Sequence, residues 1–149
     1  MNVIIQRDTR AWQMQVWIAF LIAAFLSGVG LAYLPGKPVE YGFMIMGYLF
    51  CLTMVFVLAK HVRNGEKQNA APARNDTRMY GPVVWAGFFI AMGMTGWGLF
   101  HLDVNEAYKA FLAVSWLFLV NSAFTLAKML RDRHDADLIE AAARDQATK

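Results

Sequence analysis

Four long apolar segments constrain this chain more than any other feature of its sequence. They cover about residues 12–34, 41–59, 80–100 and 108–126, and none has an Asp, Glu, Lys or Arg in its interior. Each is close to the roughly 20 residues with which an α-helix crosses the hydrocarbon core of a bilayer. A soluble chain of 149 residues that is 58% hydrophobic and 17% charged could not cover four such helices. The sequence therefore predicts an all-α membrane protein with four transmembrane helices, the first of them a retained helix and not a cleaved signal peptide.

Lysine and arginine residues predict the orientation of these helices. They gather before the first segment, between the second and third, and after the fourth, whereas the connections 35–40 and 103–109 hold one lysine each. Cytoplasmic segments carry an excess of Lys and Arg. We therefore expect both termini and the middle linker to lie in the cytoplasm and the two short connections to lie outside. The formal charge of +3 does not indicate nucleic-acid binding, because the basic residues flank apolar segments and do not form one patch.

The two halves of the chain are similar to each other at a constant offset. The tripeptide DTR at 8–10 recurs at 76–78, which is 68 positions later, and LAK at 58–60 recurs at 126–128 at the same offset. Trp17 matches Trp85, and Gly28 and Gly30 match Gly96 and Gly98. The sequence thus predicts two tandem helical hairpins, at 8–66 and 76–134, with a cytoplasmic linker at 67–75 and a cytoplasmic tail at 135–149. Because each hairpin would begin and end in the cytoplasm, the repeats should be parallel, with a symmetry axis along the membrane normal.

Small residues at a spacing of four predict helix-packing faces on the first and third helices. Rows of this kind let helix backbones approach closely in lipid, although small residues are also common in membrane helices generally. We expect the two rows to contact each other or the helices of their own hairpins. The predicted packing residues are Ala19, Ala23, Ser27 and Gly28 in the first helix and Gly87, Ala91, Thr95 and Gly96 in the third.

Aromatic and basic side chains mark the expected membrane boundaries. Amphipathic rings favour the level of the lipid headgroups, and lysine extends its ammonium group to the same level. We expect Asp and Thr of the DTR tripeptide to cap the N-termini of the first and third helices. LAK is expected at the C-terminal ends of the second and fourth helices. The predicted anchors at the inner boundary are Trp12, Trp17, Tyr80, Trp85, Lys60 and Lys128.

The apolar segments contain few groups that could perform chemistry. An ionisable residue inside the membrane would indicate a substrate or proton path, and none is present. Asn121 is the most polar residue deep in a segment, and we expect it to form an interhelical hydrogen bond or, less readily, to contact a substrate together with Thr53 and Ser115. The three histidines are scattered along the chain, so the sequence predicts no metal site, no cofactor and no catalytic residues.

The repeated hairpin, with its matched Trp, Gly-x-Gly and LAK positions, resembles the YiaA/YiaB family of small bacterial inner-membrane proteins. That family is described by a two-helix transmembrane domain with a characteristic linking section, which members can carry twice. The resemblance covers about residues 8–134. It implies a location in the bacterial cytoplasmic membrane, and it carries over no activity and no functional residues.

Together these observations favour a non-enzymatic inner-membrane protein of unknown specific activity, which serves as an accessory or interaction component or as a lipid-associated component. We expect it to interact with the lipid bilayer and with a membrane-protein partner or further copies of itself. The alternative is a small oligomeric transporter or channel that works without an intramembrane carboxylate.

Overall fold

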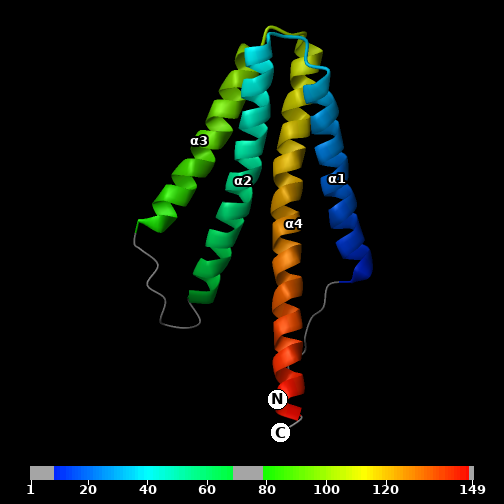
Figure 1. Cartoon of the computed structure of the whole chain (residues 1–149), viewed down its shortest axis with the longest axis vertical. Helices are drawn as coiled ribbons and strands as arrows, with labels where there is room; N and C mark the ends of the chain where they lie inside the picture. The colour runs from blue at the N-terminus through cyan, green and yellow to red at the C-terminus, as the bar shows by residue number, and fades with distance from the viewer. Residues whose placement is uncertain (1–8, 69–78, 148–149) are drawn as a thin grey trace.

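The protein is built from four long α-helices. The computed structural model describes residues 9–68 and 79–147, and within these ranges α1 covers Arg10–Ala32, α2 Pro38–Gln68, α3 Tyr80–His101 and α4 Glu106–Ala147. All four are long and apolar enough to cross a membrane. In Figure 1 the helices appear in the order α3, α2, α4, α1, so that α2 and α4 are central and α1 and α3 are peripheral. The structure therefore confirms the all-α architecture of four membrane helices.

The direction of the helices makes the two repeats parallel. The α1–α2 and α3–α4 connections lie at one end of the bundle, and α1 and α3 both start toward the other end (Figure 1). At the start of α1 the Thr9 side chain accepts a hydrogen bond of 3.3 Å from the backbone N–H of Trp12, as expected of an N-cap. The second DTR and most of the predicted linker lie outside the described residues. We call the end with the two short connections the outer end and the opposite end the inner end.

The helices pair mainly across the repeats. The most extensive contacts join α1 with α4 and α2 with α3, followed by those between α2 and α4. The two helices of each hairpin contact each other much less, and α1 and α3 are not in contact within the described residues. The two peripheral pairs are equivalent under the repeat, because α1 matches α3 and α4 matches α2. We expected α1 and α3 to pack on each other or on their own hairpin partners, and this expectation is wrong. Each of them lies mainly against the central helix of the other hairpin.

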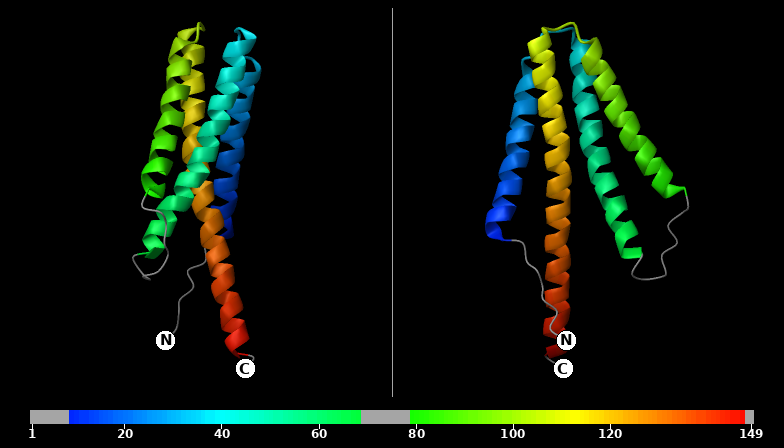
Figure 2. Two further views of the ribbon diagram at one scale, coloured as in Figure 1. Left: turned by 60° about the vertical axis from the view of Figure 1, so that its left-hand side comes forward. Right: turned by 180° about the vertical axis from the view of Figure 1, so that it is seen from behind.

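Equivalent glycines allow the peripheral helices to approach the central ones. A Cβ atom on Gly30 of α1 would lie 2.8 Å from Leu112 Cδ2 and 3.0 Å from Phe111 Cε1 of α4, so these side chains would have to shift to admit a larger residue. The matching residue in α3, Gly98, lies against Phe43 of α2, and Phe43 matches Phe111 at the same offset of 68. In the right view of Figure 2 the helices converge toward the outer end, where these contacts lie. The second glycine of each Gly-x-Gly pair therefore fixes the packing of one repeat on the other.

The central helices extend well beyond the predicted membrane segments at the inner end. Helix α2 continues to Gln68 and α4 to Ala147, which includes nearly all of the predicted tail. We expected LAK to end α2 and α4, but in both helices it lies inside the helix. The residues that follow include many good helix formers, such as Ala, Glu, Arg and Lys, and neither proline nor glycine interrupts α4. The red part of α4 in Figure 1 projects past the ends of the other helices.

Candidate functional site

A groove at the inner end of the bundle brings charged and apolar side chains together. It has a volume of about 500 Å³ and lies where α1, α2 and α4 meet. We call it the inner groove. Its walls include Val62 and Phe124, and its polar lining comes from Trp12 of α1, Arg63 of α2, and Thr125, Lys128 and Arg131 of α4. Three cations thus surround an apolar groove at the level expected for lipid headgroups.

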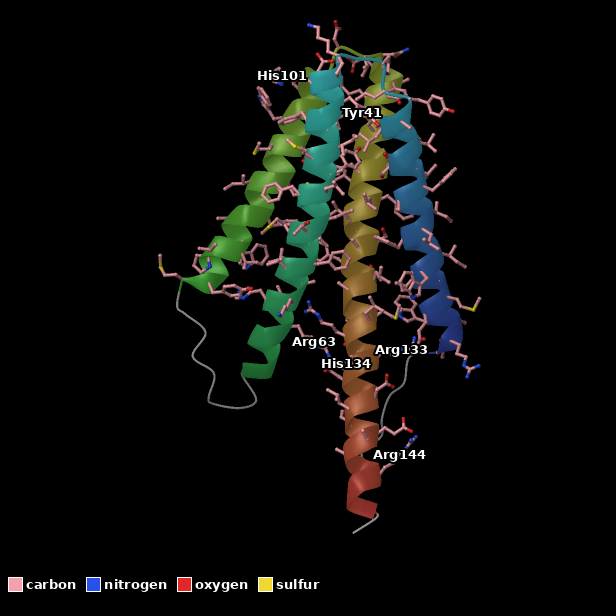
Figure 3. The ribbon with its side chains drawn as sticks, viewed as in Figure 1. Tyr41, Arg63, His101, Arg133, His134 and Arg144 are labelled. Atoms are coloured by element: carbon pink, nitrogen blue, oxygen red, sulfur yellow. The ribbon has the colours of Figure 1, made fainter. Side chains whose placement is uncertain are left out.

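Arg63 ties α2 to the part of α4 below the groove. Its Nη2 atom lies 2.6 Å from Asp135 Oδ2, and its Nη1 donates to Asp132 Oδ1. The side chain of Arg63 is 24% exposed, and those of Asp132 and Asp135 are 32% and 26% exposed. Figure 3 shows Arg63 between the two central helices. The two carboxylates offset the charge of Arg63, so this residue has a structural role in joining the helices.

Arg131 crosses the same interface in the opposite direction. This residue of α4 donates to the backbone carbonyl oxygen of Ala59, and its Nη2 atom lies 3.4 Å from the carbonyl oxygen of Phe56, both on α2. Arg131 matches Arg63 under the repeat, so equivalent arginines reach from each central helix to the other. Their acceptors differ, because Asp132 and Asp135 of α4 correspond to Asn64 and Lys67 of α2. Since its acceptors are neutral carbonyls, Arg131 retains its positive charge beside the groove.

A smaller groove continues from the inner groove toward the middle of the membrane. It has a volume of about 90 Å³ and shares Trp12 and Thr125 with the larger one. Its polar lining includes Gln15 of α1 and Asn121 of α4. The two grooves therefore form one path along α1 and α4, with cations at its inner end and neutral polar groups farther into the bilayer.

The structure does not bring the predicted intramembrane polar residues together. Asn121 is exposed, and within the described residues its side-chain amide shows no hydrogen bond to another helix. Thr53 is also exposed and donates to the carbonyl oxygen of Leu49 on its own helix. Ser115 is buried, donates to Leu112 in its own helix, and accepts a bond from Ser27 at its backbone carbonyl. The predicted interhelical bond of Asn121 is therefore absent from the described structure, because this residue faces outward beside α1.

Most of the predicted packing residues lie in helix contacts. Ala23, Ser27, Ala91 and Thr95 are buried, and Thr95 Oγ1 lies 3.3 Å from the Sγ atom of Cys51 on α2. Ala19, Gly87 and Gly96 are partly buried. Gly28 is exposed, and a Cβ atom there would contact nothing within 4 Å. The prediction that Gly28 is a packing residue is therefore wrong. Gly28 lies on the exposed face of α1, whereas Gly30 lies on the face that contacts α4.

The predicted anchors are exposed on the surface of the bundle near its inner end. Trp12, Trp17, Tyr80 and Trp85 are between 40% and 44% exposed. Lys60 and Lys128 are exposed as well. Trp12 and Lys128 also line the inner groove, and the ring of Tyr80 packs edge-on against His61 at a centroid distance of 5.5 Å.

Reasoning from the sequence missed the role of the arginines. Arg63 and Arg131 occupy matched positions in the two repeats, but their acceptors lie on another helix and could not be paired from spacing alone. A signal was present in the repeat, because two acidic residues of the second half, Asp132 and Asp135, have no acidic counterparts in the first. Within the described residues, no group of three or more His, Cys, Asp or Glu residues is arranged to hold a metal ion.

Comparison with known families gives one match. The sequence model described as "yiaA/B two helix domain" matches residues 12–64 and 82–132, which together make up more than half of the chain. Each match covers most of one hairpin, so the domain occurs twice. No curated protein and no solved structure matches the chain significantly.

Proposed function

The chain belongs to the yiaA/B two helix domain family, and from this premise we propose that it is a non-enzymatic accessory component of the bacterial inner membrane. In this proposal both termini lie in the cytoplasm, which agrees with the concentration of Lys and Arg at the inner end. The protein would act by holding a partner at the membrane, and not by transforming a substrate.

The cytoplasmic extension of α4 is the observation that carries this proposal. The helix continues for several turns past the inner groove to Ala147. On this extension Leu138 and Ile139 are 55% and 49% exposed, among side chains that are otherwise mostly charged or small. Two consecutive large apolar side chains that are exposed on a polar helix lose contact with water when a partner packs against that helix. The extension therefore offers a contact for the cytoplasmic segment of a membrane-protein partner.

Native mass spectrometry tests this role. The protein would be extracted from membranes of its own host into lipid nanodiscs and weighed together with whatever it retains. We expect a reproducible mass that includes a second kind of chain. The double variant Leu138→Glu and Ile139→Glu should lose that mass, whereas Ala142→Glu, which adds a charge at an exposed small residue of the same extension, should keep it.

An oligomeric transporter or channel is the second candidate, and the exposure of Asn121 favours it. An amide on the outer face of a membrane helix gains a hydrogen-bond partner when another copy of the chain covers it. A homo-oligomer without a second kind of chain in the experiment above would overturn the accessory role. Flux through liposomes that falls in the Asn121→Leu variant would then support the transporter.

A further inference from the structure

We propose that the inner groove and its continuation toward Asn121 bind one anionic phospholipid. The phosphate headgroup would lie beside Lys128 and Arg131, and the glycerol ester region would lie beside Asn121 and Gln15. This inference rests on the proposed position of the inner end at the cytoplasmic face of the membrane, and it goes beyond the accessory role by naming the class of ligand.

The charges around the inner groove favour a phosphate. Arg63 is already paired with Asp132 and Asp135, and the hydrogen bonds of Arg131 within the described residues go to backbone carbonyls. Lys128 is exposed at the groove, and within the described residues its ammonium group has no ion pair or hydrogen bond. Two cations that form no ion pair with another described residue thus face one groove. Basic pockets between transmembrane helices on the cytoplasmic side are suited to anionic lipid headgroups.

The groove also has the polarity gradient of a phospholipid. From the cations it passes Trp12 and Thr125 and reaches the amides of Gln15 and Asn121, both of which are exposed. Amide N–H groups can donate to ester carbonyl oxygens, and the amphipathic ring of Trp12 suits the headgroup level. Beyond these residues the surface is apolar, with exposed side chains such as Ile18 and Ile22 on α1 available to acyl chains. A soluble anion would use only the cationic end of this path.

The repeat shows that this polarity is confined to one side of the bundle. The cations have equivalents, because Lys60 and Arg63 match Lys128 and Arg131. The neutral polar residues have no such equivalents: Gln15 and Thr125 correspond to Val83 and Val57, and Asn121 corresponds to the shorter Thr53. Only the α1–α4 side therefore combines a cationic end with amides farther into the membrane. This difference supplies a matched control within the same chain.

Competitive lipid binding tests the proposal. The full-length protein in detergent would be mixed with equal amounts of phosphatidylglycerol and phosphatidylcholine, and the bound lipids would be counted by native mass spectrometry. We expect the protein to retain one phosphatidylglycerol in preference to phosphatidylcholine. Lys128→Gln should reduce that preference about fivefold, since one basic residue near the headgroup contributes about 1 kcal/mol. Lys60→Gln should leave it unchanged.

Three outcomes would overturn the proposal. The first is an unchanged preference in Lys128→Gln, and the second is an equal loss in Lys60→Gln, which would indicate attraction by net charge alone. The third is displacement of the lipid by glycerol 3-phosphate at millimolar concentration, which would identify a soluble phosphate ester as the ligand. If Lys128→Gln does not fold, Lys128→Met provides the same test, because it removes the same charge from this exposed position. The Leu138→Glu and Ile139→Glu variant should bind lipid normally, so failure of the accessory role and failure of the lipid site are distinguishable.

Discussion

Ser27 of α1 donates a hydrogen bond across 3.2 Å to the backbone carbonyl oxygen of Ser115 of α4. The equivalent contact in the other half of the bundle is that of Thr95 with Gly47, where a Cβ atom on the glycine would lie 2.7 Å from Thr95 Oγ1. Both pairs join a peripheral helix to the central helix of the other repeat, and both are buried or partly buried. Two different residue pairs therefore occupy equivalent positions in two equivalent interfaces: α1 and α4 are joined by a hydrogen bond, and α3 approaches the backbone of α2 closely.

Replacement of Gly47 tests the close approach of α2 and α3. We expect Gly47→Leu to lower the free energy of unfolding by about 1–3 kcal/mol, because the new side chain would enter the space occupied by Thr95. Reversible unfolding in mixed micelles would measure the change. Gly93→Leu is the matched control, since a Cβ atom on the exposed Gly93 meets nothing within 4 Å. Equal stability of the two variants would contradict the α2–α3 packing described above.

The buried alanines of the two rows provide a second test of packing. Ala23 and Ala91 are matched positions, and both are 0% exposed. Leucine at either position should destabilise the bundle by about 1–3 kcal/mol through overpacking, and by a similar amount at each because the environments are equivalent. Thermal unfolding in detergent would show the loss. Gly28→Leu should have a much smaller effect, because Gly28 is exposed on the same helix as Ala23. Unchanged stability of both alanine variants would mean that these rows are not packing faces.

The ion pairs of Arg63 should affect the spacing of α2 and α4 more than the overall stability. We expect Arg63→Gln to cost less than about 1 kcal/mol, because its side chain and both carboxylates are partly exposed to solvent. The inner ends of the two helices should then move apart, which spin labels on α2 and α4 would detect as a longer and broader distance. Arg133→Gln is the control, since Arg133 is exposed on the same part of α4. An unchanged distance in Arg63→Gln would show that other contacts hold the inner end together.

The proposed topology can be tested with reporter fusions. A fusion after Lys37 should report the outside of the membrane, and a fusion after Gly65 should report the cytoplasm. The physical reason is the excess of Lys and Arg at the inner end of the bundle. Alkaline phosphatase, which is active only outside the cytoplasm, would serve as the reporter for both sites. Activity of the Gly65 fusion would reverse the orientation and move the proposed lipid site to the other leaflet.

The amino-acid sequence alone was sufficient to predict four membrane helices, their parallel repeats and the family. These properties follow from local features: the length of each apolar segment, the absence of interior charges, and matched residues at one offset. Thr9 as a helix cap and the burial of Ala23 and Ala91 also follow from residue type and helical spacing. The helices, the repeats and the cap depend on the chain's own backbone or on contact with lipid. Small residues at helical spacing indicate a buried face, but they do not identify the helix that covers it.

Only the tertiary structure decided which helices contact each other. In lipid the hydrophobic effect does not select between apolar partners, so pairing depends on close fit between surfaces that are distant in sequence. Gly30 against Phe111 and Gly98 against Phe43 provide that fit, and they place α1 on α4 and α3 on α2. The same arrangement brings Trp12, Arg63 and Lys128 to one groove and turns Asn121 outward. The inner groove could not be predicted from the sequence because its residues come from three helices whose pairing is fixed by packing.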